Sequence, residues 1–185
     1  NNHIGQIILT GTNPQRKDKP LLPHQSFIID YLSPQYPFRG ILLYHYVGAG
    51  KTRTVIELAE RYILRGVLVL IWLPATLRDM WRQEIRKWGN PQYQDHPQLI
   101  DQHYKFIAYN ASNMMEQFRL ANQGLQLQHR FVIVDESQHL ISLLMNPKNK
   151  KGSGLYELLM SAVDCKFVFM SATPIVNSPF ECGKM

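Results

Sequence analysis

The sequence contains few cysteines and no long hydrophobic run. Its two cysteines, Cys165 and Cys182, are too few for a disulfide framework and too far apart for a metal-binding knuckle. A reducing compartment is therefore expected. No apolar run approaches the ~18 residues that a transmembrane helix requires, so no membrane partner is expected. The opening residues, NNHIGQIILTGT, lack the basic head and cleavage site of a secretory signal.

The histidines and the net charge give only weak evidence about ligands and partners. The seven histidines are scattered without an HExxH or similar ligand spacing, which argues against a zinc site. The net charge of +6 is compatible with an anionic polymer as partner but does not require one. At 185 residues and 45% hydrophobic composition, the chain is long enough for one compact domain. It lacks an initiator methionine and a clear terminal element, so both ends are expected to be cuts from a longer protein.

A glycine-rich loop carries the first chemical signal. The segment GAGKT, Gly48–Thr52, lies between the apolar run Gly40–Val47 and the run Lys51–Leu64, whose apolar residues recur at helical spacing. Its glycines let successive backbone N–H groups curl around an anion, where the positive end of a helix dipole also points. This order of strand, loop and helix predicts a phosphate-binding loop. The alternative is a plain glycine turn that precedes Lys and Thr.

The loop predicts a nucleoside triphosphate and Mg²⁺ as ligands. Lys51 is expected to reach the β- and γ-phosphates as a point charge, and the Thr52 hydroxyl to ligate Mg²⁺. The common loop pattern has glycine where this sequence has His45, which points away from small GTPases and common P-loop kinases. The predicted nucleotide-binding residues of the loop are Gly48, Ala49, Gly50, Lys51, Thr52 and Arg53.

Strand-like and helix-like runs alternate along the chain. The predicted strands are Gly40–Val47, Val67–Leu73, Lys105–Tyr109, Phe131–Asp135 and Lys166–Met170. The predicted helices are Pro23–Leu32, Lys51–Leu64, Leu77–Trp88, Ser112–Asn122, Ser137–Met145 and Gly154–Ala162. Parallel strands need crossover connections, so the alternation predicts an α/β fold with a mainly parallel central sheet and helices on both faces. The polar stretch Asn90–Gln102 and the basic stretch Lys148–Lys151 are predicted to be loops.

Two carboxylates follow the apolar strand that ends at Val134. Asp135 and Glu136 are therefore expected at the carboxyl edge of a parallel sheet, where the phosphate-binding loop also lies. In the catalytic interpretation, Asp135 holds Mg²⁺ and Glu136 orients and deprotonates the attacking water, beside Lys51. In the alternative interpretation, Asp135 or Ser137 only caps the following helix.

A third strand ends in SATPIVNS. The hydroxyls of Ser171 and Thr173, which flank Ala172, could hydrogen-bond to the DES segment at Asp135 and couple the hydrolytic centre to outer loops. A Ser/Thr turn after a strand is also ordinary. Large apolar side chains at helical or strand positions are expected in the core: Trp72, Trp81, Trp88, Met114, Met115, Met145 and Met160.

These segments, in this order, resemble the first RecA-like domain of superfamily 2 helicases and nucleic-acid translocases. GAGKT is similar to motif I, DESQ to motif II and SATP to motif III. LLPHQ resembles the upstream element whose glutamine recognises adenine, so the resemblance implies that Gln25 selects ATP. Motif II commonly has histidine at its fourth place, where this sequence has Gln138 followed by His139, and this departs from the DEAH subgroup.

The resemblance also implies a nucleic-acid partner. LPATL is similar to motif Ia, which implies backbone contacts from Pro74, Ala75 and Thr76, and YNASN falls where Asn110 would make a second contact. TPIVNS resembles a segment of Swi/Snf-type DNA translocases. The loop style HYxGxGKT resembles that of the nucleoside triphosphatase I and early-transcription-factor ATPases of poxviruses and other large DNA viruses.

The implied architecture has three parts. Residues 1–20 are expected to form an N-terminal extension, residues 21–178 the first RecA-like domain, and residues 179–185 the start of a connection to a second RecA-like domain. Motifs IV to VI, which supply arginine fingers in this family, do not occur in the sequence, so the domain alone is expected to bind ATP but hydrolyse it poorly. The expected location is cytoplasm or virion, with the nucleus as the alternative.

Three functions from different classes fit these residues. The first is the ATP-binding lobe of a DNA- or RNA-dependent ATPase that works with a second RecA-like domain, and with transcription machinery or in genome handling. The second is a P-loop phosphotransferase for a small molecule. The third is a nucleotide-gated scaffold in which hydrolysis is incidental.

Overall fold

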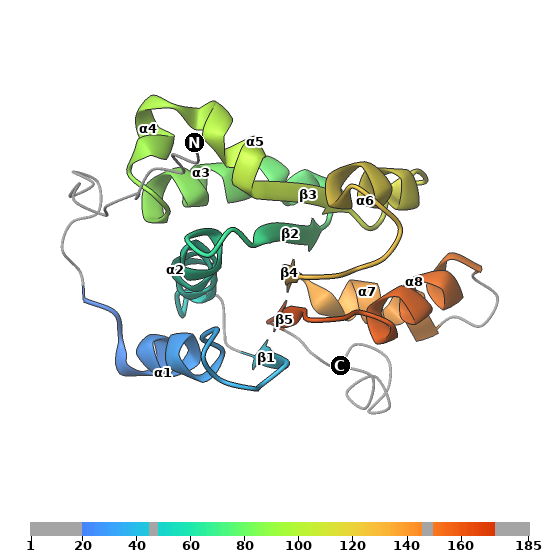
Figure 1. Ribbon diagram of the computed structural model, residues 1–185, viewed down its shortest axis with the longest axis horizontal. Helices are drawn as coiled ribbons and strands as arrows, with labels where there is room; N and C mark the ends of the chain where they lie inside the picture. Colours follow the sequence, from blue (N-terminus) through green and yellow to red (C-terminus); the bar gives the residue numbers. More distant parts are fainter. Residues whose placement is uncertain (1–19, 45–47, 146–149, 173–185) are drawn as a thin grey trace, which may run out of the picture.

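The computed structural model describes residues 20–44, 48–145 and 150–172 (Figure 1). Within these ranges it has five strands: β1 Gly40–Tyr44, β2 Leu68–Leu73, β3 Tyr104–Ala108, β4 Arg130–Val134 and β5 Lys166–Ser171. They form one sheet in the order β1-β5-β4-β2-β3, and every neighbouring pair is parallel. The predicted α/β fold with a parallel sheet is confirmed.

The longer helices match the predicted ones closely. They are α1 Pro23–Tyr31, α2 Lys51–Ile63, α3 Arg78–Trp88, α6 Met114–Asn122, α7 Ser137–Met145 and α8 Lys150–Met160. A 3-10 turn, η1 Ala75–Leu77, leads into α3. Helices α1, α2 and α3 lie on one face of the sheet and α6, α7 and α8 on the other (Figure 1). The predicted extension and the predicted connection remain predictions, since residues 1–19 and 173–185 lie outside the described ranges.

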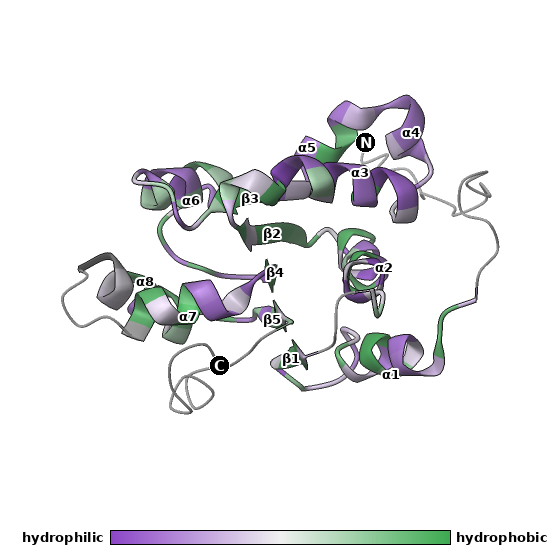
Figure 2. Cartoon of the chain, turned by 180° about the vertical axis from the view of Figure 1, so that it is seen from behind, coloured by the Kyte–Doolittle hydropathy of each residue, from purple (hydrophilic) through white to green (hydrophobic). Residues whose placement is uncertain are grey.

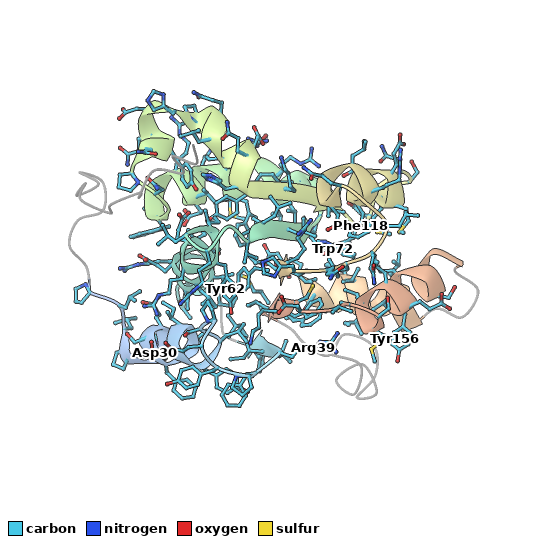
Figure 3. The ribbon with its side chains drawn as sticks, in the orientation of Figure 1. Asp30, Arg39, Tyr62, Trp72, Phe118 and Tyr156 are labelled. Atoms are coloured by element: carbon cyan, nitrogen blue, oxygen red, sulfur yellow. The ribbon has the colours of Figure 1, made fainter. Side chains whose placement is uncertain are left out.

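The central strands β2 and β4 are buried on both faces, and the alternation of their side chains contributes to two cores. Along β2, Val69 and Ile71 belong to the core under α1, α2 and α3, whereas Leu70 and Trp72 belong to the opposite core. Figure 2 shows β2 in green and most of α3 in purple, because α3 buries only a narrow stripe of its surface. In Figure 3, Tyr62 and Trp72 mark the two cores on either side of the sheet.

Two predicted loops are wrong in part. The stretch Asn90–Gln102 contains the short helices α4 Gln92–Asp95, η2 Pro97–Leu99 and α5 Ile100–His103. They form because Tyr93 and Ile100 are buried in the α2 and α3 core, which fixes the polar chain between them. The basic stretch is also partly helical, since α8 begins at Lys150.

Two predicted core methionines are at the surface. Met115 and Met160 are 38% and 61% exposed, because both lie on the outward side of their helices, whereas Met114 is buried as predicted. The Met145 side chain lies outside the described part of the structure. Among the described residues, no helix is both long and hydrophobic enough to span a bilayer.

The carboxyl group of Glu60, on α2, packs against tyrosine side chains. Tyr104 donates its hydroxyl to Oε1 of Glu60 at 2.6 Å, and burial nevertheless raises the pKa of Glu60 from 4.5 to about 7. A raised folded-state pKa contributes stability that is fully present below pH 4.5 and is lost as the pH rises through 7. The folded domain is therefore expected to lose stability across this window.

Replacing this carboxyl group by an amide should remove the loss. We expect Glu60→Gln to be more stable than the wild type at pH 8 by ~3 kcal/mol, and nearly equal to it at pH 4. Thermal unfolding at the two pH values measures the difference. Glu157→Gln, on the exposed side of α8, is the matched control and should change neither value. Equal stability of Glu60→Gln and the wild type at pH 8 would show that the buried carboxylate carries no such penalty.

Candidate active site

The glycine loop presents the N-terminus of α2 to the carboxyl edge of the sheet. Gly48 and Gly50 have φ of 89° and 77°, a left-handed conformation that glycine adopts at little cost. Gly50 is the N-cap residue of α2 and, as a glycine, has no side chain that could cap the helix. An uncapped helix N-terminus beside a lysine is a suitable site for phosphate. His45, which replaces the first glycine of the common pattern, lies outside the described residues.

Gln25 supports this loop from α1. Its side chain is almost fully buried, accepts the backbone N–H of Leu22 at 2.9 Å and donates to the carbonyl of Gly50 at 3.3 Å. A Cβ atom at position 50 would displace the Gln25 amide, and the positive φ of Gly50 also favours glycine at this position. Adenine recognition by Gln25 stays a prediction. The two hydrogen bonds leave one amide hydrogen and one lone pair of the amide oxygen with which Gln25 could bind adenine.

Asp135 lies directly after β4, and both of its carboxylate oxygens accept hydrogen bonds. The indole Nε1 of Trp81 donates to Oδ2 at 2.7 Å, and the backbone N–H of Glu136 donates to Oδ1 at 2.9 Å. Burial raises the pKa of Asp135, and the Trp81 hydrogen bond and the nearby charge of Lys51 oppose that rise. Since neither oxygen bonds to the first turn of α7, the interpretation of Asp135 as a helix cap is not supported.

Glu136 adopts an unusual backbone conformation. Its φ of 47° is in the left-handed region, which a residue with a side chain occupies at an energetic cost. The hydroxyl of Tyr109 lies 3.1 Å from the backbone carbonyl oxygens of both Asp135 and Glu136 and shares its single hydrogen between them. The side-chain amide of Gln138 donates to Oε2 of Glu136 at 2.6 Å. Several contacts therefore fix both the backbone and the carboxylate of Glu136.

The predicted link from the third strand end runs through Gln138. Ser171, at the end of β5, donates its buried hydroxyl to Oε1 of Gln138 at 2.7 Å, and Gln138 in turn holds Glu136. The partner of Ser171 is thus Gln138, the residue that directly follows the predicted DES segment. The sequence drew attention to Gln138 only as a departure from histidine, although an amide can donate and accept at once and so bridge two partners. Thr173 lies outside the described residues.

One cavity of ≈ 810 Å³ joins the loop to the acidic pair. The predicted site residues that line it are Gln25, Gly48, Ala49, Gly50, Lys51, Thr52, Arg53, Asp135, Glu136, Ser171 and Ala172. Trp88 also lines it, and the guanidinium of Arg53 lies 4.6 Å from the centre of its ring. The sequence indicated only a core role for Trp88. Trp88 lies in the last turn of α3 among charged residues, and nothing in that local sequence predicts a contact with Arg53.

The donor set suits a magnesium ion that is shared with a nucleotide. Across the described residues, no group of three or more His, Cys, Asp and Glu side chains could hold a metal by itself. Mg²⁺ commonly takes one or two protein oxygens and completes its octahedron with phosphate oxygens and water. The Asp135 carboxylate and the Thr52 hydroxyl line the same cavity and match that requirement.

The segments that the resemblance assigns to nucleic acid lie at the same edge of the sheet but outside this cavity. Pro74, Ala75 and Thr76 follow β2, and Asn110 follows β3. The backbone N–H of Ala75 donates to Oδ1 of Asn110 at 3.2 Å, so the two segments adjoin. Thr76 and Asn110 are exposed and accessible to a ligand.

Comparison with known proteins identifies relatives in large DNA viruses. The chain is 28% identical to a candidate ATP-dependent RNA helicase of Acanthamoeba polyphaga mimivirus, covering 85% of this chain and 30% of that protein. It is 31% identical to the termination factor NPH-I homolog of African swine fever virus (isolate Warthog/Namibia/Wart80/1980), covering 77% of this chain and 21% of that protein. The chain therefore spans less than a third of either relative.

A solved structure shares the fold. The Sulfolobus solfataricus SWI2/SNF2 ATPase core, determined in complex with double-stranded DNA, superposes with a TM-score of 0.65 at 20% identity, covering 90% of this chain and 35% of that one. The family described as "Type III restriction enzyme, res subunit" matches residues 18–176. The chain belongs to this family and is a helicase-type ATPase domain of superfamily 2 with a RecA-like fold.

Proposed function

We propose that this domain binds ATP with Mg²⁺ and, within the whole protein, hydrolyses it in response to nucleic acid as part of a DNA translocase or helicase that serves viral transcription or genome handling. The observation that carries the proposal is the shared cavity, in which the glycine loop, Lys51 and the acidic pair face one another. The viral relatives and the DNA complex of the similar ATPase core support the choice of partner.

Each residue has a defined task in this mechanism. The N-terminus of α2 and Lys51 neutralise the phosphates, while Thr52 and Asp135 would hold the magnesium ion, which supplies further positive charge to the phosphoryl group. Glu136 orients the attacking water and accepts its proton. The Gln138 amide keeps one Glu136 oxygen directed, and Ser171 keeps that amide in place.

Hydrolysis coupled to movement also needs a second lobe. We infer that the whole protein supplies one, whose arginines would approach the γ-phosphate when the cleft closes. This accounts for the low activity expected of the single domain. It also separates the proposal from a small-molecule phosphotransferase, which would transfer phosphate without any polymer.

An ATPase assay of the whole protein tests the proposal. We expect duplex or single-stranded DNA to stimulate hydrolysis with little dependence on sequence, because the contacts are mainly to phosphates. If roughly four phosphates are contacted, the apparent affinity for DNA should fall about 100-fold between 50 and 200 mM salt. RNA in a parallel assay distinguishes the two polymers. Hydrolysis that no polynucleotide changes, together with phosphate transfer to a small acceptor, would favour the phosphotransferase.

A further inference from the structure

Two buried aromatic side chains hold the acidic pair from elements outside the loop. Trp81 is fully buried on α3 and directs its indole N–H to the carboxylate of Asp135. Tyr109 lies immediately after β3 and directs its hydroxyl to the backbone carbonyls of Asp135 and Glu136. The Trp81 indole orients the carboxylate that would face Mg²⁺. The Tyr109 hydroxyl holds the peptide groups before and after Glu136, whose φ is positive.

Both side chains are close in sequence to the segments assigned to nucleic acid. Tyr109 directly precedes the exposed Asn110, and Trp81 lies in the first turns of α3, which follows η1. The hydrogen bond between Ala75 and Asn110 connects these two segments at the surface. A displacement of either segment would therefore move a donor of the acidic pair.

We propose that Trp81 and Tyr109 are positioning residues that hold Asp135 and Glu136 in the geometry for hydrolysis and transmit nucleic-acid binding at Thr76 and Asn110 to that geometry. This inference rests on the proposed function, because it assumes that the acidic pair hydrolyses ATP and that the two exposed segments bind nucleic acid. It assigns these aromatic side chains a role that core packing alone does not require.

A comparison within the same molecule separates positioning from packing. Trp72 is also fully buried, and its indole N–H has no hydrogen-bond partner among the described residues. Trp81→Phe and Trp72→Phe therefore remove the same volume, but only the first removes a hydrogen bond to the site. In the same way, Tyr109→Phe is matched by Tyr62→Phe, which removes a hydroxyl bonded to the carbonyl of Leu32, away from the site.

The tryptophan pair is tested by binding as well as by rate. With the whole protein, we expect Trp81→Phe to weaken Mg²⁺-dependent binding of a fluorescent ATP analogue by about 10- to 100-fold and to leave binding in excess EDTA unchanged. The turnover number should fall by a similar factor. Trp72→Phe should match the wild type in both assays. Equal Mg²⁺ dependence of the two variants would overturn the role of Trp81.

The tyrosine pair is tested by the response to DNA. We expect Tyr109→Phe to lower the turnover number about tenfold or more, to leave KM for ATP unchanged, and to reduce the ratio of DNA-stimulated to basal rates. A purely structural effect would lower the basal and the DNA-stimulated rates by the same factor and leave their ratio unchanged. The control Tyr62→Phe should also leave this ratio unchanged. An unchanged ratio in Tyr109→Phe would overturn the proposed transmission, and this pair decides the question if Trp81→Phe fails to fold.

Failure of this inference can be distinguished from failure of the proposed function. If the wild-type protein hydrolyses no ATP or ignores polynucleotides, the proposed function is wrong. If the wild type is stimulated while Trp81→Phe and Tyr109→Phe behave as their matched controls do, only the positioning role is wrong.

Discussion

Lys51→Ala is expected to abolish ATP binding by the domain. The cavity contains the carboxylates of Asp135 and Glu136, and a bound triphosphate adds further negative charge. Arg53 and Lys87 also line the cavity, but Lys51 is the cationic side chain that directly follows the glycine loop, so its loss should lower the affinity about a hundredfold or more. Titration with a fluorescent ATP analogue measures the change.

A second lysine variant controls for the general loss of a positive charge. Lys105 lies on β3 and does not line the cavity, so Lys105→Ala should bind the analogue as the wild type does. If Lys51→Ala binds the analogue with undiminished affinity, the assignment of the phosphate-binding loop is wrong.

Glu136→Gln should separate ATP binding from hydrolysis. The amide has nearly the same shape and can still accept the hydrogen bond from Gln138, but it cannot take a proton from water. We expect ATP affinity close to that of the wild type and a turnover number about 10²- to 10⁴-fold lower in the whole protein. Steady-state hydrolysis and analogue binding, measured on the same preparation, give the two values.

Glu157→Gln, at an exposed position of α8, is the matched control and should hydrolyse ATP normally. Hydrolysis by Glu136→Gln at the wild-type rate would remove Glu136 from the chemistry. Full biological activity of a hydrolysis-deficient Glu136→Gln protein would instead support the nucleotide-gated scaffold.

The sequence predicted the framework of this site because the signals are local. The strands of a largely buried parallel sheet are short apolar runs, so the ends of β4 at Val134 and of β5 at Ser171 could be predicted to within one residue. The carboxyl ends of parallel strands meet at one edge, which is why three separate motifs could be expected to converge. Residue chemistry gave the expected roles of Lys51, Thr52 and the acidic pair, and the family resemblance added those of Gln25 and of the nucleic-acid segments.

The sequence could not predict contacts that depend on distant packing. Helical spacing correctly placed Trp81 in the core, but its partner Asp135 lies 54 positions away along the chain. A general rule gave a partial signal, since a buried indole N–H usually finds an acceptor. Trp72 shows why that rule could not decide the matter, because its indole N–H is buried with no hydrogen-bond partner in the described part of the chain. The short helices around Tyr93 were missed for a related reason: tertiary burial of two residues outweighs a polar, proline-containing composition.

The most direct measurement is a structure of the protein bound to Mg²⁺ and a non-hydrolysable ATP analogue. We expect the triphosphate to lie on the backbone of Gly48–Thr52 beside Lys51, the cation between the Thr52 hydroxyl and Asp135, and Glu136 opposite the γ-phosphate. A triphosphate bound elsewhere, or a cation remote from Asp135, would contradict this arrangement.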